Sequence, residues 1–167
     1  TQATSSAASD VYKRQDGAVF QMVSHGIISG ALFLAIGVIY ERTHTRDINK
    51  LGDFATTMPK YSVFLMFFTL GSVGLPGTSG FIGEVLVLIG SWKVNPLVAI
   101  ISGFSLILGA IYMLRFYRKI SFGISENQDK YEIHDVNMRE FMILIPLVMF
   151  IILFGIFPNI VLNFLKV

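Results

Sequence analysis

The sequence predicts an all-α polytopic membrane protein with four transmembrane spans, the second of them a discontinuous, broken helix. The chain has 167 residues, and its apolar residues are gathered in blocks instead of alternating with polar ones as in soluble domains. Each block reaches the roughly 20 residues that a membrane span needs. The basic residues lie in loops between the blocks. The predicted spans cover residues 17–40, 61–92, 96–117 and 141–162.

The first 16 residues do not follow this pattern, because they are small, polar and aperiodic, without the apolar core of a signal peptide. We interpret residues 1–16 as a disordered tail or an artefact of assembly. Residues 17–167 then form one transmembrane domain. Because the chain stops directly after an apolar run, we expect it to be a piece of a longer protein.

The second block decides the number of crossings. As one straight helix, residues 61–92 would run for about 48 Å, far beyond a hydrocarbon core of roughly 30 Å. Two separate spans divided at "PGTSG" would be too short, at about 22 Å and about 20 Å. The basic residues are concentrated after the first and third blocks, and the positive-inside rule places both loops on the cytoplasmic side. The second block then crosses once.

We therefore expect two half-helices joined by an unwound segment at residues 76–80, where Pro76, Gly77 and Gly80 make a helix hard to sustain. Irregular backbone at membrane depth is tolerated only where it is packed in protein or lines a wet cavity. Broken helices of this kind often mark ion sites in transporters. A simple kink in a tilted helix is the alternative interpretation.

Two ionisable residues lie inside the predicted spans. Glu84 is eight residues before Trp92, the expected interface anchor, and His25 is eight residues after Gly17, where the first span enters from the same side. Both side chains are therefore about 12 Å deep and at similar heights if their helices are neighbours. A charged acid near mid-membrane costs roughly 2.5–3.5 kcal/mol, so an intramembrane acid is a candidate functional residue.

These two residues suit proton transfer. A carboxylate in apolar surroundings changes its protonation with its environment, and histidine titrates near neutral pH. We predict that Glu84 loads and releases a proton and that His25 passes it along. The structural alternatives are a hydrogen bond from Glu84 to a neighbouring helix, and a neutral His25 bonded to a carbonyl.

Small and polar residues accompany the candidates. Gly26 and Gly30 form a small-xxx-small pair beside His25, with Ser29 one turn beyond His25. One face of the third predicted span would border a water path or serve close helix packing equally well; it carries Ser102, Ser105, Gly109 and Tyr112. We interpret His44, in the basic loop, and His134, in the polar linker, as ordinary loop residues, and nothing in that linker suggests a site.

The sequence does not support metal, redox, nucleic-acid or hydrolytic chemistry. The chain has no cysteine, so it supplies no disulfide, thiolate metal site or iron–sulfur ligand. A formal net charge of +2 is too small to suggest nucleic-acid binding. No metal-ligand spacing or Ser/His/Asp set stands out, and "GTSGFIG" lacks the following Lys-Ser or Lys-Thr of a phosphate-binding loop.

The stretch "GAVFQMVSHGIISGALFLAIGVIYERTHTRDI", followed by "LPGTSGFIGEVLVLIGSW", closely resembles the antiporter-like subunit M family (chain 4 in mitochondria) of respiratory NADH:quinone oxidoreductase, complex I. The resemblance runs from about Gly17 to the end. It implies a fourteen-helix fold with two inverted five-helix repeats, of which this C-terminal fragment holds the last four helices. It implies that Glu84 is the acid of the discontinuous twelfth helix, near the exit to the outside. It also implies that His25 is the histidine of the eleventh helix, in the hydrated central axis.

The resemblance further implies a function. The chain would belong to a non-redox subunit that couples NADH-to-quinone electron transfer to proton pumping, in a bacterial plasma membrane or a mitochondrial inner membrane. No cofactor is expected on it, since NADH, FMN, iron–sulfur clusters and quinone bind elsewhere in the complex. The expected partners are the neighbouring subunits L and N, which carry lysine in place of Glu84, together with the lipid bilayer, protons and internal water. The first repeat's glutamate–lysine pair and central lysine lie outside this chain, which therefore holds only the exit-side half of a proton path.

Two other functions stay open. A subunit of a multi-subunit sodium/proton antiporter or of a membrane-bound hydrogenase shares the broken helix and often the buried charge, although "YERTHTRD" favours complex I. A passive membrane scaffold would use Glu84 only for helix pairing. The scaffold hypothesis predicts that Glu84→Gln leaves pumping intact, because the amide keeps most hydrogen bonding and removes the titration.

Overall fold

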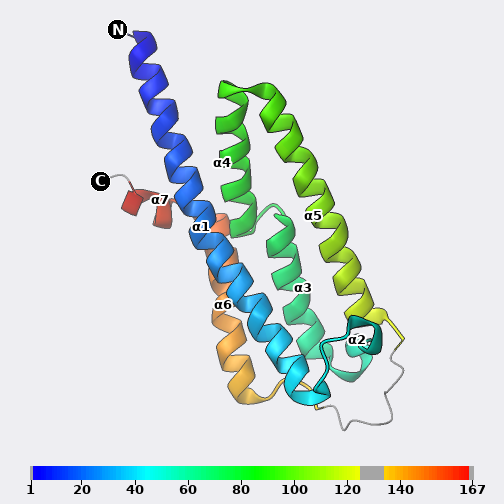
Figure 1. The fold of residues 1–167 in the computed structure, drawn as a ribbon. Helices are drawn as coiled ribbons and strands as arrows, with labels where there is room; N and C mark the ends of the chain where they lie inside the picture. Colours follow the sequence, from blue (N-terminus) through cyan, green and yellow to red (C-terminus); the bar gives the residue numbers. More distant parts are fainter. Residues whose placement is uncertain (1, 125–133, 166–167) are drawn as a thin grey trace.

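The computed structural model describes residues 2–124 and 134–165, and every regular element in these ranges is a helix. Figure 1 shows the long helices running along one another, with α2 at the opposite end of the bundle from the turn that joins α4 to α5. In chain order the elements are α1 (Gln2–Thr43), the 3-10 helix η1 (Ile48–Lys50), α2 (Phe54–Thr57), α3 (Pro59–Val73), α4 (Ser79–Val94), α5 (Pro96–Phe122), α6 (Met138–Ile156) and α7 (Asn159–Leu165).

Three of these helices are long and apolar enough to cross a membrane: α1 from Gln15 to Thr43, α5, and α6. An all-helical fold with apolar spans confirms the predicted fold class in this coarser form. The bounds differ from the sequence pattern by five or more residues at three places. Helix α1 begins at Gln2, within the stretch interpreted as a tail. Helix α5 continues to Phe122, beyond the predicted end at residue 117, and α6 ends at Ile156, where the pattern continued to residue 162.

Helices α3 and α4 divide the second apolar block. Helix α3 begins at Pro59, a residue that suits the first position of a helix because its missing N–H needs no partner there. It ends at Val73 and is capped by Gly74, whose φ of 74° is left-handed. There the amide of Leu75 donates to the carbonyl of Leu70 at 3.0 Å, a Schellman-type end that favours glycine. Residues 74–78 are not helical, where we expected an unwound segment at 76–80, and α4 begins at Ser79.

The end of α3 and the beginning of α4 lie side by side. A Cβ on Gly80 would collide with the carbonyl oxygen of Gly71, so the two helices approach each other through glycine backbone. Figure 1 shows α4 continuing in the direction of α3, displaced sideways, with the link between them folded back. The non-helical link, residues 74–78, is called the break below.

Helix α3 forms the centre of the bundle. It packs against α1, α4, α5 and α6. Small residues on α1 allow other helices to approach it closely, since Ala31 and Ala35 are both fully buried. The hydrophobic core is formed mainly by buried side chains of three helices. Its members include Phe64, Leu65 and Phe68 of α3, Ile28 and Ile39 of α1, and Leu144, Val148 and Ile151 of α6.

A polar cluster joins three helices at the end of the bundle where α1 finishes. The guanidinium of Arg42 forms a bidentate ion pair with the carboxylate of Glu140, with N···O distances of 2.7 and 2.9 Å. Its Nε donates to the carbonyl of His134 at 2.7 Å, and Nη2 donates to that of Asp135 at 3.3 Å. The carboxylate of Asp135 in turn accepts the amides of Lys60 and Tyr61 in the first turn of α3.

The start of α6 completes this cluster. Asn137 and Glu140 form a capping box, in which each side chain accepts the backbone N–H of the other residue. Glu140 thus serves both the cap and the ion pair. We call the set Arg42, Asp135, Asn137 and Glu140 the Arg42 clasp. It lies partly in the linker where the sequence suggested no site.

Candidate proton-transfer site

Helices α1 and α4 pack against each other in opposite directions over several turns. A Cβ on Gly17 would lie 2.8 Å from the Cβ of Leu86, and a Cβ on Gly83 would collide with the side chain of Gln21. Farther along, the hydroxyl of Ser24 donates to that of Ser79 at 2.8 Å. Rising numbers on α1 therefore meet falling numbers on α4, and the contacts set the relative heights of the candidate residues.

The carboxylate of Glu84 lies at the break. It rests against the α-carbon of Gly74, where a Cβ would collide with the carboxylate oxygen Oε2. The left-handed φ of Gly74 and this close contact both require glycine at that position. Glu84 is half-buried, and within the part of the chain that the structure describes it has no hydrogen-bond or ion-pair partner. The acid is therefore placed where the helix backbone is interrupted.

His25 lies on the neighbouring helix but does not touch Glu84. It follows Ser24, and Glu84 follows Gly83, so both side chains lie on the same side of the antiparallel pair. Since Gln21 is opposite Gly83, the two candidates are separated along the helix axes by about five residues, or about 7.5 Å. From the sequence we expected His25 and Glu84 to lie at similar depths in the membrane. The imidazole is exposed on the surface of the described bundle.

Several buried polar groups on the helices around Glu84 and His25 were not predicted from the sequence. Ser24 and Ser79 are 2% and 0% exposed, and they bond to each other across the two helices. Two more oxygen atoms, Oε1 of Gln21 and Oγ1 of Thr69, are buried without a partner among the described residues. The spacing 17, 21, 24 and 28 on α1 marks one helical face, and that period could have identified Gln21 and Ser24 as inward-facing.

The other sequence candidates fall outside this site. Nothing lies within 4 Å of a Cβ built on Gly26 or Gly30, so this small-xxx-small pair packs against no described helix. Ser29 donates to the carbonyl of His25 at 2.5 Å within α1. The face of α5 that contains Ser105 is largely exposed, and its hydroxyl bonds the carbonyl of Ser102.

The two remaining histidines lie near other elements. The ring of His44 packs edge-on against that of Tyr40, with 6.2 Å between ring centroids. His134 contributes its carbonyl oxygen to the Arg42 clasp. Neither residue approaches the break, which agrees with their interpretation as ordinary loop residues.

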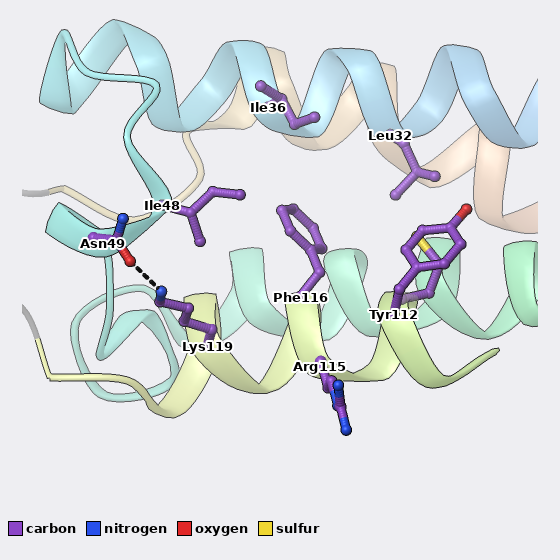
Figure 2. A pocket seen from close by; sticks show the side chains of 9 residues that line it. Leu32, Ile36, Ile48, Asn49, Tyr112, Arg115, Phe116 and Lys119 are labelled. Atoms are coloured by element: carbon purple, nitrogen blue, oxygen red, sulfur yellow. Dashed lines mark hydrogen bonds between the residues drawn. The ribbon is translucent and has the colours of Figure 1, made fainter. Parts of the chain in front are cut away.

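A groove of about 640 Å³ lies between α1, η1 and α5. Figure 2 shows Leu32, Ile36 and Phe116 pointing into it, while Arg115 points away. At its rim the ammonium group of Lys119 donates to the side-chain oxygen of Asn49 at 2.5 Å. The groove contains neither Glu84 nor His25, and its lining is mostly apolar. It is therefore unsuited to proton transfer.

No group of three or more metal-ligating side chains occurs among the described residues. The site is an acid at a helix break, a histidine on the adjacent helix and buried hydroxyl and amide groups between two apolar helices. Such an arrangement can exchange protons within a membrane, since ionisable and polar side chains in spans mark ion or proton routes.

Comparison with known proteins identifies the class. Residues 4–109 match the model of the family described as NADH:quinone oxidoreductase/Mrp antiporter, TM. The chain belongs to this family and is an integral membrane protein. The match begins ahead of Gly17, the residue at which the sequence resemblance was placed.

Within this class the chain is similar to proteins named NADH-quinone oxidoreductase subunit M. It is 49% identical over 146 residues to that of Rhodobacter capsulatus, covering 87% of this chain and 28% of the relative. It is 48% identical over 147 residues to that of Rickettsia felis, covering 88% and 30%. The NADH-ubiquinone oxidoreductase chain 4 of Chondrus crispus is 43% identical, with 89% and 30% covered. The chain thus spans under a third of the length of these relatives.

Solved structures agree on the fold. A chain of the respiratory complex I from Thermus thermophilus with bound NADH superposes with a TM-score of 0.83 at 31% identity, over 94% of this chain and 33% of that chain. A chain of the Mrp complex from Dietzia sp. DQ12-45-1b superposes with a TM-score of 0.79 at 18% identity, over 90% and 36%. The second likeness concerns the fold alone.

Proposed function

We propose that this chain is the exit-side part of a proton path in a membrane subunit M of NADH:quinone oxidoreductase. The single observation behind this proposal is the position of Glu84, an acid that has no bonding partner among the described residues and lies at the break between two half-helices. Its role is to take up a proton from the interior side and release it to the outside. His25 is the group that supplies the proton.

The proposal includes the topology. Helices α3 and α4 have 15 and 16 residues, or about 22 Å and about 24 Å each, so neither spans a core of roughly 30 Å alone. Joined at the break they cross once, which makes four spans in this chain. The interrupted backbone leaves helix ends at membrane depth, and such ends are tolerated where they line a polar cavity.

The same proposal covers the complex in which the chain works. The partners are other membrane subunits of complex I, with L and N as neighbours, and the chain itself binds no cofactor. Redox chemistry elsewhere in the complex supplies the energy, and this chain provides the titrating groups. Support comes from the names of the relatives, from the likeness to a complex I chain, and from an acid placed at the break.

The test is Glu84→Gln in the full-length subunit, assembled into the complex and reconstituted in vesicles with NADH and quinone. The amide keeps the shape and most hydrogen-bonding capacity but does not titrate. Loss of a proton-transfer group typically costs about a hundredfold or more in rate, so we expect pumping and coupled electron transfer to fall steeply.

The matched control is Glu84→Asp, which retains a carboxyl group and should keep measurable pumping. Native gels of both variants must show an intact complex. Normal pumping by assembled Glu84→Gln would reduce Glu84 to a helix-pairing residue and support the scaffold hypothesis instead.

A further inference from the structure

Along the helix axes, Gln21 lies between the backbone positions of the two candidate proton carriers, His25 and Glu84. It lies four residues before His25 on α1, so the two side chains share a helical face one turn apart. On α4 its side chain packs against Gly83, the residue directly before Glu84. Along the helix axes, the backbone of Gln21 therefore lies within the interval of about 7.5 Å between the backbone positions of His25 and Glu84.

The close approach of Gln21 depends on glycine. A Cβ on Gly83 would lie 2.9 Å from the Cβ of Gln21 and would collide with its Oε1. A larger residue at position 83 would therefore exclude the amide from the helix interface. The missing side chain leaves room for a polar group between otherwise apolar helices.

The amide oxygen of Gln21 needs a donor. Oε1 is buried, and no hydrogen-bond partner lies within reach among the described residues. Leaving a buried acceptor unpaired costs about 1–3 kcal/mol, and the great majority of such atoms in proteins bond to protein or to ordered water. A Cα–H contact with Gly83 is too weak to replace that bond. Water is the donor that also fits a proton route.

We propose that Gln21 positions a water molecule that begins a short water chain between His25 and Glu84. This inference rests on the proposed function and names a third residue of the same route. The water receives a proton from the imidazolium of His25 and passes one of its own toward the carboxylate of Glu84. His25 is left neutral, Glu84 becomes a neutral acid, and the water is unchanged. Gln21 itself does not change protonation, which makes it a positioning residue.

The experiment compares Gln21→Leu and Gln21→Glu in the assembled, full-length complex. The measurements are the rate of proton pumping, the number of protons pumped per NADH and the pH profile of pumping. Leucine keeps the packing on Gly83 and removes the acceptor, so we expect about tenfold slower pumping, the factor that one lost hydrogen bond in the transition state represents. Glutamate keeps an oxygen acceptor, so pumping should be largely retained with a displaced pH profile.

Two further variants keep the test decisive. Gln21→Met follows the length of glutamine and replaces leucine if the latter fails to assemble. Met22→Leu is the matched control on the next residue, whose side chain is 64% exposed, and it should pump like the unchanged protein.

The outcomes separate the two proposals. Unchanged pumping and pH profile in Gln21→Leu, or in Gln21→Met, would overturn the water-positioning role, and so would equal losses with leucine and glutamate. If Glu84→Gln abolishes pumping in the same preparation, the proposed function survives that result. If Glu84→Gln also pumps normally, the proposed function itself fails.

Discussion

The Arg42 clasp and the break are both polar regions within an apolar bundle, yet their hydrogen bonding is opposite. In the clasp, the guanidinium donates to one carboxylate and three carbonyls, and the carboxylate of Glu140 also caps α6. The carboxylate of Glu84 at the break, and the amide oxygen of Gln21 beside Gly83 on α4, have no partner among the described residues.

The difference teaches which polar groups can exchange protons. A carboxylate in a bidentate pair with arginine loses several charge-assisted bonds if it takes up a proton, so its charge is locked. An acid without such bonds changes protonation at lower cost. The clasp is thus suited to holding helices together, and the break is suited to chemistry. The following three predictions test this contrast, from the largest expected effect on stability to the smallest.

The strongest test breaks the clasp. Arg42→Met should lower the free energy of unfolding of the full-length protein in detergent by about 3–5 kcal/mol, because the mostly buried carboxylate of Glu140 is left unpaired. Chemical denaturation measures this loss. Adding Glu140→Met should recover part of it, since the unpaired charge is then removed. Equal stability of Arg42→Met and the unchanged protein would contradict a structural role for the clasp.

A second test strains the break. Gly74→Ala adds a Cβ at a left-handed φ and against the carboxylate of Glu84, so it should cost about 1–2 kcal/mol of stability and also displace the acid. We therefore expect a large loss of pumping rate together with this modest loss of stability. Gly26→Ala, where the described chain leaves open space, is the control. A loss of stability with normal pumping would show that pumping does not depend on the contact between Glu84 and Gly74.

The smallest expected effect concerns the cap. Asn137→Ala removes one half of the capping box and should cost about 1 kcal/mol. Pumping should remain normal, because the ion pair between Arg42 and Glu140 is retained. Thermal unfolding together with pumping assays checks both expectations. A pumping defect in this variant would show that the two regions are not independent.

Local sequence signals predicted much of the helical arrangement. Pro76 and the glycines around it interrupt the second apolar block because proline lacks an amide donor and glycine favours turn conformations. Glu84 stood out because an acid is costly among apolar residues. The sequence motif Asn137-x-x-Glu140 also carried a capping signal, although we expected no site in that polar linker.

What the sequence alone determined is therefore local: apolar blocks that form membrane helices, the place where one block is interrupted, and the ionisable residues inside these blocks. Only the tertiary structure decided which distant residues meet. Arg42 pairs with Glu140 across 98 positions, and Ser24 bonds Ser79 across 55. Such pairs depend on how whole helices pack, and their spacing leaves no periodic trace in the chain. For the same reason, the proposed role of Gln21 became visible only in the tertiary structure, where α1 packs against the glycine at position 83.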